Sequence, residues 1–385
     1  MIRSWPGFLF AFFFGVFCWI GIEQPPQLNF DEIHYVNAAR ARLADAAPVN
    51  LEHPPLGKIL IARGMDWLGD NPEGWRVMSC MFGALTVLGV YLWAWSLWGN
   101  VGTAILAALL TATNQMVYVQ ARIAMLDTFL VAFLVWAAFC FSYWWRHRQQ
   151  FSFLIASGAL IGLAVATKWF ALVPLAAMGV LLLRKGLRQR PTSLKHAFGF
   201  GAIALLAYAI WFPPSQFVKA QLDMWSLQQA VASEHNYASS WWTWPVEWRP
   251  TWYAYENVPN SDLVRGVLFI GNPLILWFGF AAVLFCAWKG WREKRGPALE
   301  IAFAFAVCWL CWPLLPRKLS LFYYYYPAAL VLSLASTEVS RGFPRARWAF
   351  AALAVMVFLF FLPLLNWSSI TPEAMHWRIW FQSWI

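Results

Sequence analysis

Apolar residues along this chain come in blocks of about 17 to 24, separated by short polar or basic stretches. As helices, blocks of this length cross a hydrocarbon core of about 30 Å. Backbone groups inside lipid must be hydrogen-bonded within their own segment, which favours helices. The pattern predicts an all-α integral membrane fold with eleven spans, near residues 5–22, 78–98, 101–118, 123–145, 153–168, 169–184, 197–213, 264–288, 298–315, 321–337 and 347–366.

Composition and charge indicate which ends of the predicted spans face the cytoplasm. With 61% hydrophobic and 12% charged residues, the chain is not an ordinary water-soluble protein. The net charge of +10 does not indicate nucleic-acid binding, because the basic residues lie in short loops between apolar blocks. If the N-terminus is cytoplasmic, every inner loop except the turn near Asn100 is basic, and the acids inside are Glu293, Glu300 and Glu338. The positive-inside rule therefore predicts a cytoplasmic N-terminus and an exoplasmic C-terminus.

The first block, residues 8–22, resembles a signal peptide, but no small-residue cleavage site follows it. We therefore expect it to remain as the first span of a single multi-span domain, residues 1–385. Two outer segments, residues 23–77 and 214–265, are too long to be mere connections. We expect helices in these outer loops, the first starting near residues 29–31 with one apolar side formed by Ile33, Val36, Ala39 and Leu43.

Two adjacent carboxylates, Asp31 and Glu32, follow the first span on the outer side. They could supply a general base and an anchor for a metal or a hydrogen bond. On a helix, Asp31 would share a face with His34 and Tyr35. The alternative is that Asp31 caps a helix.

A second outer motif, residues 52–58, contains two prolines and a glycine before a predicted helix. His53 and Lys58 belong to it, and Lys58 could meet a phosphate or a carboxylate at the helix start. A plain turn with a solvated lysine would explain the same residues.

Basic residues at outward-facing turns depart from the charge bias: Arg122, Lys168, and the pair Arg317 and Lys318. Charges at span ends are costly unless they reach the interface, pair with an acid or bind a ligand. Asp127 or an outer-loop carboxylate could pair with Arg122. Because these four basic residues all lie on the predicted outer side, we expect some of them to bind an anion. Arginine suits phosphate because its guanidinium forms two parallel hydrogen bonds.

The second outer segment is rich in tryptophan and contains one histidine in a polar context. His235 could orient a sugar or a phosphate, or serve a structural role. Trp244, in a cluster with Trp241 and Trp242, could stack on a sugar face, or belong to an interfacial aromatic belt.

Taken in order along the chain, these segments resemble the protein O-mannosyltransferase family, polyprenyl-phosphate-dependent glycosyltransferases with the GT-C fold. The matching residues are Phe30-Asp31-Glu32, His34-Tyr35, His53-Pro54-Pro55-Leu56-Gly57-Lys58, Trp75-Arg76, Phe82-Gly83, Ala121-Arg122-Ile123, Leu126-Asp127, Thr167-Lys168-Trp169, His235-Asn236-Tyr237, Trp242-Thr243-Trp244-Pro245, Gly271-Asn272-Pro273 and Tyr324-Tyr325-Tyr326-Pro327.

The resemblance implies inverting transfer of a sugar such as mannose from a dolichyl- or polyprenyl-phosphate carrier. Asp31 would match the catalytic acidic residue that deprotonates the acceptor, with Glu32, Arg122 and His235 in support. Arg317 and Lys318 lie where the family holds the donor phosphate. We take as donor-phosphate candidates Arg122, Lys168, Arg317 and Lys318, and as substrate-binding candidates His34, Tyr35, His53, Lys58, His235 and Trp244.

Several questions stay open at this point. The soluble sugar-binding-like (MIR) module of eukaryotic members is missing between the middle and late spans, so the acceptor is a protein Ser/Thr hydroxyl, a glycan or a lipid head group. Related lipid A aminosugar transferases share the Asp-Glu pair, and a transporter for lipid-linked sugars is a rival of another class. A divalent metal is possible, and the compact chain favours a bacterial inner membrane over the endoplasmic reticulum.

Overall fold

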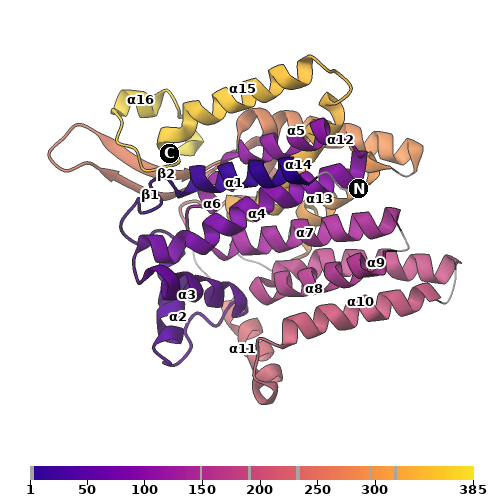
Figure 1. Cartoon of the computed structure of the whole chain (residues 1–385). Coiled ribbons are helices and arrows are strands. Elements are labelled where there is room, and N and C mark those ends of the chain that lie inside the picture. Colours follow the sequence, from indigo (N-terminus) through magenta and orange to yellow (C-terminus); the bar gives the residue numbers. More distant parts are fainter. Residues whose placement is uncertain (1–3, 148–149, 190–191, 231–234, 295, 316–318) are drawn as a thin grey trace.

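The computed structural model describes residues 4–147, 150–189, 192–230, 235–294, 296–315 and 319–385. It is mostly helical, and its long helices run side by side in one bundle (Figure 1). The bundle helices are α1 (Trp5–Trp19), α4 (Pro72–Trp98), α5 (Val101–Ala112), α6 (Gln115–Gln120), α7 (Leu126–Arg146), α8 (Phe151–Thr167), α9 (Leu172–Gln189), α10 (Thr192–Ala209), α12 (Pro273–Glu293), α13 (Pro297–Trp309), α14 (Tyr326–Ser340) and α15 (Ala346–Phe361).

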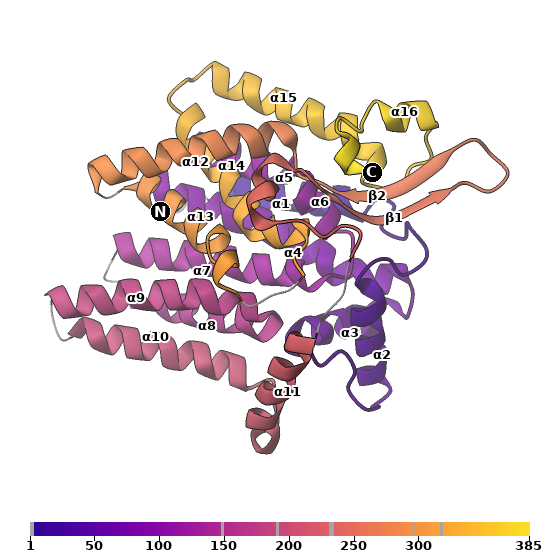
Figure 2. The same ribbon diagram turned by 180° about the vertical axis from the view of Figure 1, so that it is seen from behind.

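The remaining elements gather at one end of the bundle, which we call the outer end (Figures 1 and 2). Here lie α2 (Glu32–Leu43), α3 (Leu56–Leu68), α11 (Phe217–Ala230), α16 (Pro372–His376) and a hairpin of β1 (Thr251–Asn257) and β2 (Val264–Phe269). Short 3-10 turns occur at Trp169–Ala171, Pro214–Gln216, Trp241–Val246, Trp312–Leu314, Phe322–Tyr325, Leu362–Leu364 and Gln382–Trp384. The C-terminus lies at the outer end, and the N-terminus at the opposite one (Figure 1).

Among the described residues, six helices are long and apolar enough to cross a membrane. A seventh span is possible if the helices Leu194–Ala209 and Pro214–Ala230, bent by 99° to each other, count as one. Shorter apolar helices occupy Trp5–Trp19, Val101–Ala112 and Phe151–Thr167. The multi-span membrane fold is therefore confirmed, whereas the count of eleven stays a prediction.

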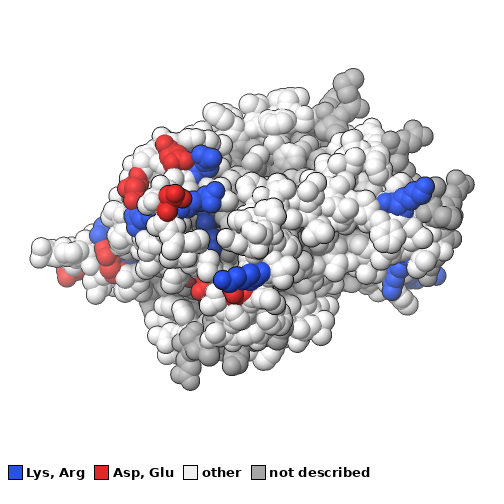
Figure 3. Space-filling view, turned by 90° about the horizontal axis from the view of Figure 1, so that it is seen from below, with Lys and Arg blue, Asp and Glu red and all other residues white. Residues whose placement is uncertain are grey.

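A face of the molecule seen in Figure 3 shows how charge follows this arrangement. A wide band without charged side chains separates the two ends. Acidic side chains appear toward the outer end, together with basic ones, while the opposite end carries only Lys and Arg on this face. A surface belt without charged side chains between two charged ends is consistent with a protein that crosses a lipid bilayer.

The expectation of an all-α fold was wrong in one region, residues 251–269. Thr251 pairs with Phe269 in an antiparallel ladder that continues to Asn257 and Val264. The predicted span 264–288 thus begins too early, because β2 occupies its first residues and α12 starts only at Pro273. The apolar residues of β2 look like span residues in sequence, since burial of a strand and of a membrane helix selects the same side chains.

The predicted helix in the first outer segment exists as α2, but its buried side differs from the expected one. Val36 and Ala39 are fully buried, as predicted. Ile33 and Leu43 are instead 48% and 44% exposed, and Tyr35 takes their place in the core. The buried face of α2 is therefore rotated from the predicted one by about one residue, toward the side that carries Glu32.

Arg76 on α4 is fully buried and ties four segments together. Its Nε and Nη2 donate to the two carboxylate oxygens of Glu32 at 2.8 and 2.9 Å. Its Nη1 donates to the carbonyls of Ile22 and Pro25 at 2.9 and 2.8 Å. Glu32 also accepts from the Ala124 amide at 2.8 Å, so the α6–α7 connection joins the same network. Every charged atom here has partners, which a buried ion pair needs.

Two acids at the opposite end of the bundle are also paired. Glu338 accepts from Lys289 at 2.8 Å and from the Trp98 indole at 2.7 Å. Glu300 accepts from Arg146 at 2.9 Å. These are two of the three acids that sequence places on the basic inner side, and each neutralises a basic residue that links neighbouring helices.

Replacing Arg76 with Met should lower the free energy of unfolding by about 3–5 kcal/mol, because Glu32 would be left as an unpaired buried charge. The matched control is Arg63→Met, which removes an exposed pair with Asp66 and should cost about 1 kcal/mol or less. Thermal unfolding in detergent compares the two variants. Equal losses in both would contradict the assignment, and adding Glu32→Gln to Arg76→Met should recover part of the loss.

Candidate functional site

Asp31 lies at the N-terminus of α2, but its side chain does not cap the helix. Its Oδ2 accepts long hydrogen bonds from the hydroxyls of Tyr35 and Tyr323, both at 3.4 Å. The side chain is partly exposed. The capping alternative is therefore excluded, and the carboxylate is left available to an incoming group.

The pKa of Asp31 is raised from its ordinary value. Burial among protein atoms is the main cause, since it disfavours the charged form, and the neighbouring carboxylate of Asp127 adds to it. The ammonium of Lys168 acts in the opposite direction. Asp31 is thus a stronger base than an ordinary aspartate, held next to a fixed cation.

Glu32 points away from Asp31, into the protein, and is fully buried. Adjacent residues of a helix do not share a face. Both oxygens of Glu32 are occupied by Arg76, by Ala124 N–H and by Asn29 N–H at 3.1 Å. The two carboxylates of the motif therefore have different surroundings: Glu32 is fully buried, whereas Asp31 is partly exposed.

Lys168 forms a buried ion pair with Asp127. Its Nζ donates to Oδ1 and Oδ2 at 3.0 and 2.9 Å. Lys168 terminates α8, Asp127 is in the first turn of α7, and the Lys168 ammonium also lies 5.2 and 5.4 Å from the rings of Tyr323 and Tyr324. Sequence analysis did not select Asp127 as a site residue. Its position at the outer start of a span was the available signal.

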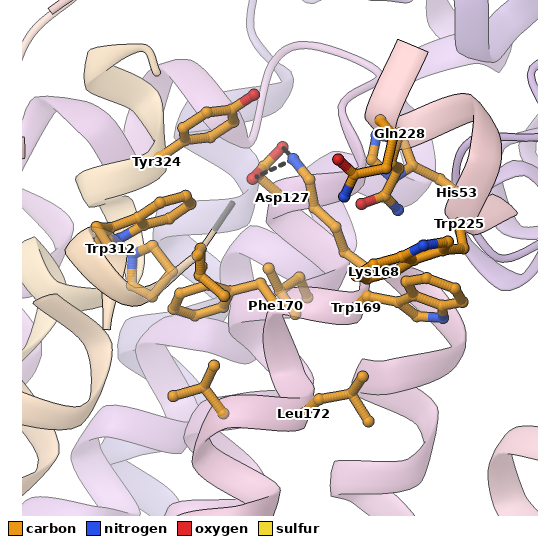
Figure 4. Close-up of a pocket in the computed structure, with 15 residues that line it drawn as sticks. His53, Asp127, Lys168, Trp169, Phe170, Leu172, Trp225, Gln228, Trp312 and Tyr324 are labelled. Carbon is orange, nitrogen blue, oxygen red and sulfur yellow. Dashed lines mark hydrogen bonds and ion pairs between the residues drawn. The ribbon is translucent and has the colours of Figure 1, made fainter. Parts of the chain in front are cut away.

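A cavity of about 180 Å³ opens beside this ion pair (Figure 4). The stick view shows the Lys168–Asp127 pair with Gln228 and His53 to one side and Tyr324 and Trp312 to the other. Fifteen residues line the cavity: His53, Asp127, Leu130, Lys168, Trp169, Phe170, Leu172, Val173, Trp225, Gln228, Gln229, Trp312, Leu315, Tyr324 and Pro327. A buried cation, a carboxylate and amides within aromatic walls are typical of a small-molecule site.

Aromatic rings connect Asp31 with this cavity. Phe30 stacks on Tyr253 with centroids 4.5 Å apart and meets the edge of Tyr323 at 5.7 Å. Tyr323 contacts Tyr324 at 4.5 Å, and Tyr324 stacks on Trp312 at 4.9 Å. Segments from both outer loops and from the start of α14 thus form one continuous wall between the candidate base and the candidate phosphate site.

The His53–Lys58 motif shapes the loop before α3. Lys58 is buried, and its Nζ donates to the carbonyls of Asn50 and His53 at 2.5 and 2.7 Å. Burial lowers the pKa of Lys58 to about 8. Gly57 lets α3 approach α7, because a Cβ there would lie 2.5 Å from a Leu126 methyl. His53 lines the cavity, whereas the charge of Lys58 is directed at loop carbonyls.

Three other candidates lie in different surroundings. His34 is exposed, and its charge acts on Asp31. The Nδ1 of His235 accepts from the Tyr237 amide at 3.1 Å, and its ring lies 6.3 Å from that of Phe30. Trp244 is fully buried, and its indole donates to Ser239 at 3.0 Å. Because no face of Trp244 reaches the surface, the structure contradicts its proposed role in stacking on a sugar.

Arg122 does not pair with Asp127, contrary to one expectation. It donates to the carbonyls of Cys18, Ile20 and Gly21 at 2.5–2.6 Å, where α1 ends. The last carbonyls of a helix lack intrahelical partners and favour a cation. Arg122 thus fixes the end of α1 instead of lining the cavity. Arg317 and Lys318 lie outside the described residues.

Metal binding finds no support in the described residues. No group of three or more His, Cys, Asp or Glu side chains among them could hold an ion. Asp127 has Lys168 as its charged partner, and Glu32 has Arg76.

Comparisons with known proteins agree with this architecture. The family model described as dolichyl-phosphate-mannose-protein mannosyltransferase matches residues 52–212. The model of the C-terminal four-transmembrane region of protein-O-mannosyltransferase matches residues 213–384. A polyprenol-phosphate-mannose–protein mannosyltransferase of Corynebacterium glutamicum is 26% identical over 86% of this chain and 81% of its own.

Two solved structures share the fold. The Saccharomyces cerevisiae protein O-mannosyltransferase Pmt1-Pmt2 complex bound to the sugar donor aligns with a TM-score of 0.84 at 14% identity, over 100% of this chain and 93% of that chain. ArnT from Cupriavidus metallidurans bound to undecaprenyl phosphate aligns with a TM-score of 0.61 at 16% identity, over 94% and 70%. With two family models that together span residues 52–384, the chain belongs to the protein O-mannosyltransferase family.

Proposed function

We propose that this protein transfers mannose from a polyprenyl-phosphate carrier to a hydroxyl group of an acceptor protein. The observation that carries the proposal is Asp31, a carboxylate of raised basicity beside a cavity that contains a buried lysine. A base for the acceptor and a cation for the leaving phosphate are the two groups this reaction needs.

In the proposed reaction, the acceptor oxygen attacks the anomeric carbon while Asp31 takes its proton. The bond from that carbon to the phosphate oxygen breaks, and the carrier leaves as a phosphate monoester with one additional negative charge. Attack and departure occur on opposite faces of the sugar, which gives inversion. No acid is needed at the leaving oxygen, because Lys168 can stabilise its charge.

The charge balance of the described residues requires a further cation beside an anionic donor. Asp31 and Asp127 carry two negative charges and Lys168 one positive charge, so Lys168 has no excess to offer while it is fully paired with Asp127. A phosphate at Lys168 would therefore share the ammonium with Asp127 and gain from a further cation. Arg317 and Lys318 remain our proposal for that cation. Leu315, two residues before Arg317, lines the cavity.

The other motif residues then receive revised roles. Glu32 would position Asp31 through Arg76, and Arg122 would hold the end of α1, so neither would touch the donor. His34, Tyr35 and His235 surround Asp31 or its neighbour Phe30 and remain proposed acceptor-side residues. His53 faces the cavity, and Lys58 would fix the loop that carries it.

A protein acceptor is favoured by the relative from C. glutamicum, whose name specifies a protein substrate. A second candidate is a transferase with a glycan or lipid head group as acceptor, since an undecaprenyl phosphate-alpha-4-amino-4-deoxy-L-arabinose arabinosyl transferase, whose name specifies no protein substrate, is 27% identical over 80% of this chain. We further propose eleven spans with a cytoplasmic N-terminus and the site on the exoplasmic side, consistent with chain ends at opposite ends of the bundle (Figure 1). A bacterial inner membrane is the proposed location.

Asp31→Asn should reduce transfer of radiolabelled mannose from polyprenyl-phosphate-mannose to a Ser/Thr-rich peptide by roughly 10²–10⁴-fold, the usual contribution of a general base. Asp45→Asn, at an exposed position of the same outer segment, is the matched control and should retain full activity. Substantial activity of Asp31→Asn would rule out Asp31 as the base. Label on a lipid extract alone would keep the chemistry and change the acceptor.

The rate at subsaturating substrate should rise with pH through the pKa of Asp31, because only the ionised carboxylate accepts a proton. Since that pKa is raised, the acidic limb should lie above the ordinary value of 3.8. Tyr323→Phe removes a hydrogen bond to the ionised form and should move the limb to higher pH. Tyr255→Phe, on the exposed hairpin, should not. A limb that moves to lower pH in Tyr323→Phe would contradict the assignment.

Lys168→Met should weaken binding of undecaprenyl phosphate by roughly 10–100-fold, the range expected for losing a charged hydrogen bond. Lys219→Met, at an exposed position of α11, should bind normally. The double variant Lys168→Met with Asp127→Asn leaves no unpaired buried charge, so it separates loss of binding from loss of folding. Unchanged affinity in the folded double variant would remove Lys168 from the phosphate site.

A further inference from the structure

Helix α11 forms one wall of the cavity with three side chains, Trp225, Gln228 and Gln229. The helix is held at its angle to α10 by a short chain of hydrogen bonds. Trp169 donates to the Tyr208 hydroxyl at 3.1 Å, and that hydroxyl donates to Gln221. Because Trp169 follows Lys168 directly, these hydrogen bonds fix the position of the α11 wall relative to the Lys168 ammonium.

The two amides on this wall are not required by the ion pair. Lys168 is neutralised by both oxygens of Asp127 without them. Gln228 is oriented from outside the cavity, because its Nε2 donates to the Glu52 carbonyl at 2.8 Å. This leaves the Oε1 of Gln228 to accept a hydrogen bond from another donor. Figure 4 shows Gln228 beside the Lys168–Asp127 pair, with His53 on the same side.

The side chains of this wall are better suited to bind the sugar of the donor than to bind its phosphate or its prenyl chain. A phosphate is best held by cations, and a prenyl chain needs only apolar surface, such as that around Phe170 and Leu172 on the lining. Sugar hydroxyls donate and accept, as primary amides do. An indole such as that of Trp225 can cover the apolar face of a hexose ring.

We propose that Gln228 and Gln229 bind hydroxyl groups of the carrier-linked hexose, with Trp225 against its ring, and that this wall selects the sugar. The inference rests on the proposed function for the identity of the donor. It assigns the selection of the sugar to α11, separately from the base at Asp31 and from the cation at Lys168.

The test compares Gln228→Leu and Gln229→Leu with Gln216→Leu, the same substitution at an exposed position just before α11. Binding is measured with undecaprenyl phosphate and with mannosyl-phosphoryl-undecaprenol. Transfer to a Ser/Thr peptide is measured with the mannosyl donor and with its glucosyl epimer. Gln228→Asn serves as a second variant, because it keeps the amide but shortens its reach.

Each cavity variant should lose roughly 10-fold in kcat/KM for the mannosyl donor, the effect of one lost hydrogen bond, and should discriminate less between mannose and glucose. Affinity for sugar-free undecaprenyl phosphate and the KM of the peptide should not change, and Gln216→Leu should behave as wild type. An equal loss of affinity for mannosyl-phosphoryl-undecaprenol and for sugar-free undecaprenyl phosphate would overturn the proposal, since the wall would then bind the phosphate or the prenyl chain. Unchanged sugar preference in folded variants would overturn it as well.

The two proposals can fail separately. If wild-type protein moves no mannose, the proposed function is wrong, while the binding comparison still decides the role of α11. If wild-type protein transfers mannose and the variants keep its preference, the function stands and the inference is wrong.

Discussion

The buried pair of Glu32 and Arg76 is the constraint on which the site depends. Taking two charges out of water is costly, and this pair is tolerable because each partner is fully hydrogen-bonded. Arg76 contacts the connection after α1, while Glu32 receives an amide from the α6–α7 connection. The position of Glu32 is therefore dictated from several directions. Asp31 precedes it in the chain, and its carboxylate is held apart from that of Glu32, beside the hydroxyls of Tyr35 and Tyr323.

The second ion pair, Lys168 with Asp127, serves a different purpose from the first. An unpaired ammonium at this depth would be costly, and the two hydrogen bonds to Asp127 hold Lys168 in place. The pair lies on a cavity wall, whereas the Glu32–Arg76 pair has no exposed surface. An anion can therefore compete for Lys168 but not for Arg76. Arg76 and Lys168 are both buried, and they differ in that only Lys168 lines the cavity.

The outer end of the bundle assembles the site from segments far apart in sequence. Phe30 from the first outer segment stacks on Tyr253 of β1 and meets Tyr323 before α14, and Trp225 on α11 lines the cavity. Helices that cross the membrane provide a rigid base for these loops. At the opposite end of the bundle, ion pairs such as Glu300 with Arg146 join neighbouring helices.

The sequence by itself determined the membrane class, the approximate spans, the helix at residue 32 and the ordered motifs that indicate the family. These depend on local composition and periodicity, which the chain displays directly. It also selected Lys168 and His53, which line the cavity, and Asp31 as candidate site residues. It misjudged the hairpin at Val264, because an apolar strand and the start of a span use the same residues.

Only the tertiary structure decided which charges meet. Glu32 and Arg76 are 44 residues apart, and Lys168 and Asp127 are 41 apart. Sequence analysis suggested an ion pair between Asp127 and the nearby Arg122, but Arg122 instead donates to the carbonyls at the end of α1. It likewise left the burial of Trp244 and the wall made by α11 unseen. Which charged residues form ion pairs depends on how the helices pack and on which side chains face the interior. Neither property can be inferred from a single segment of the sequence.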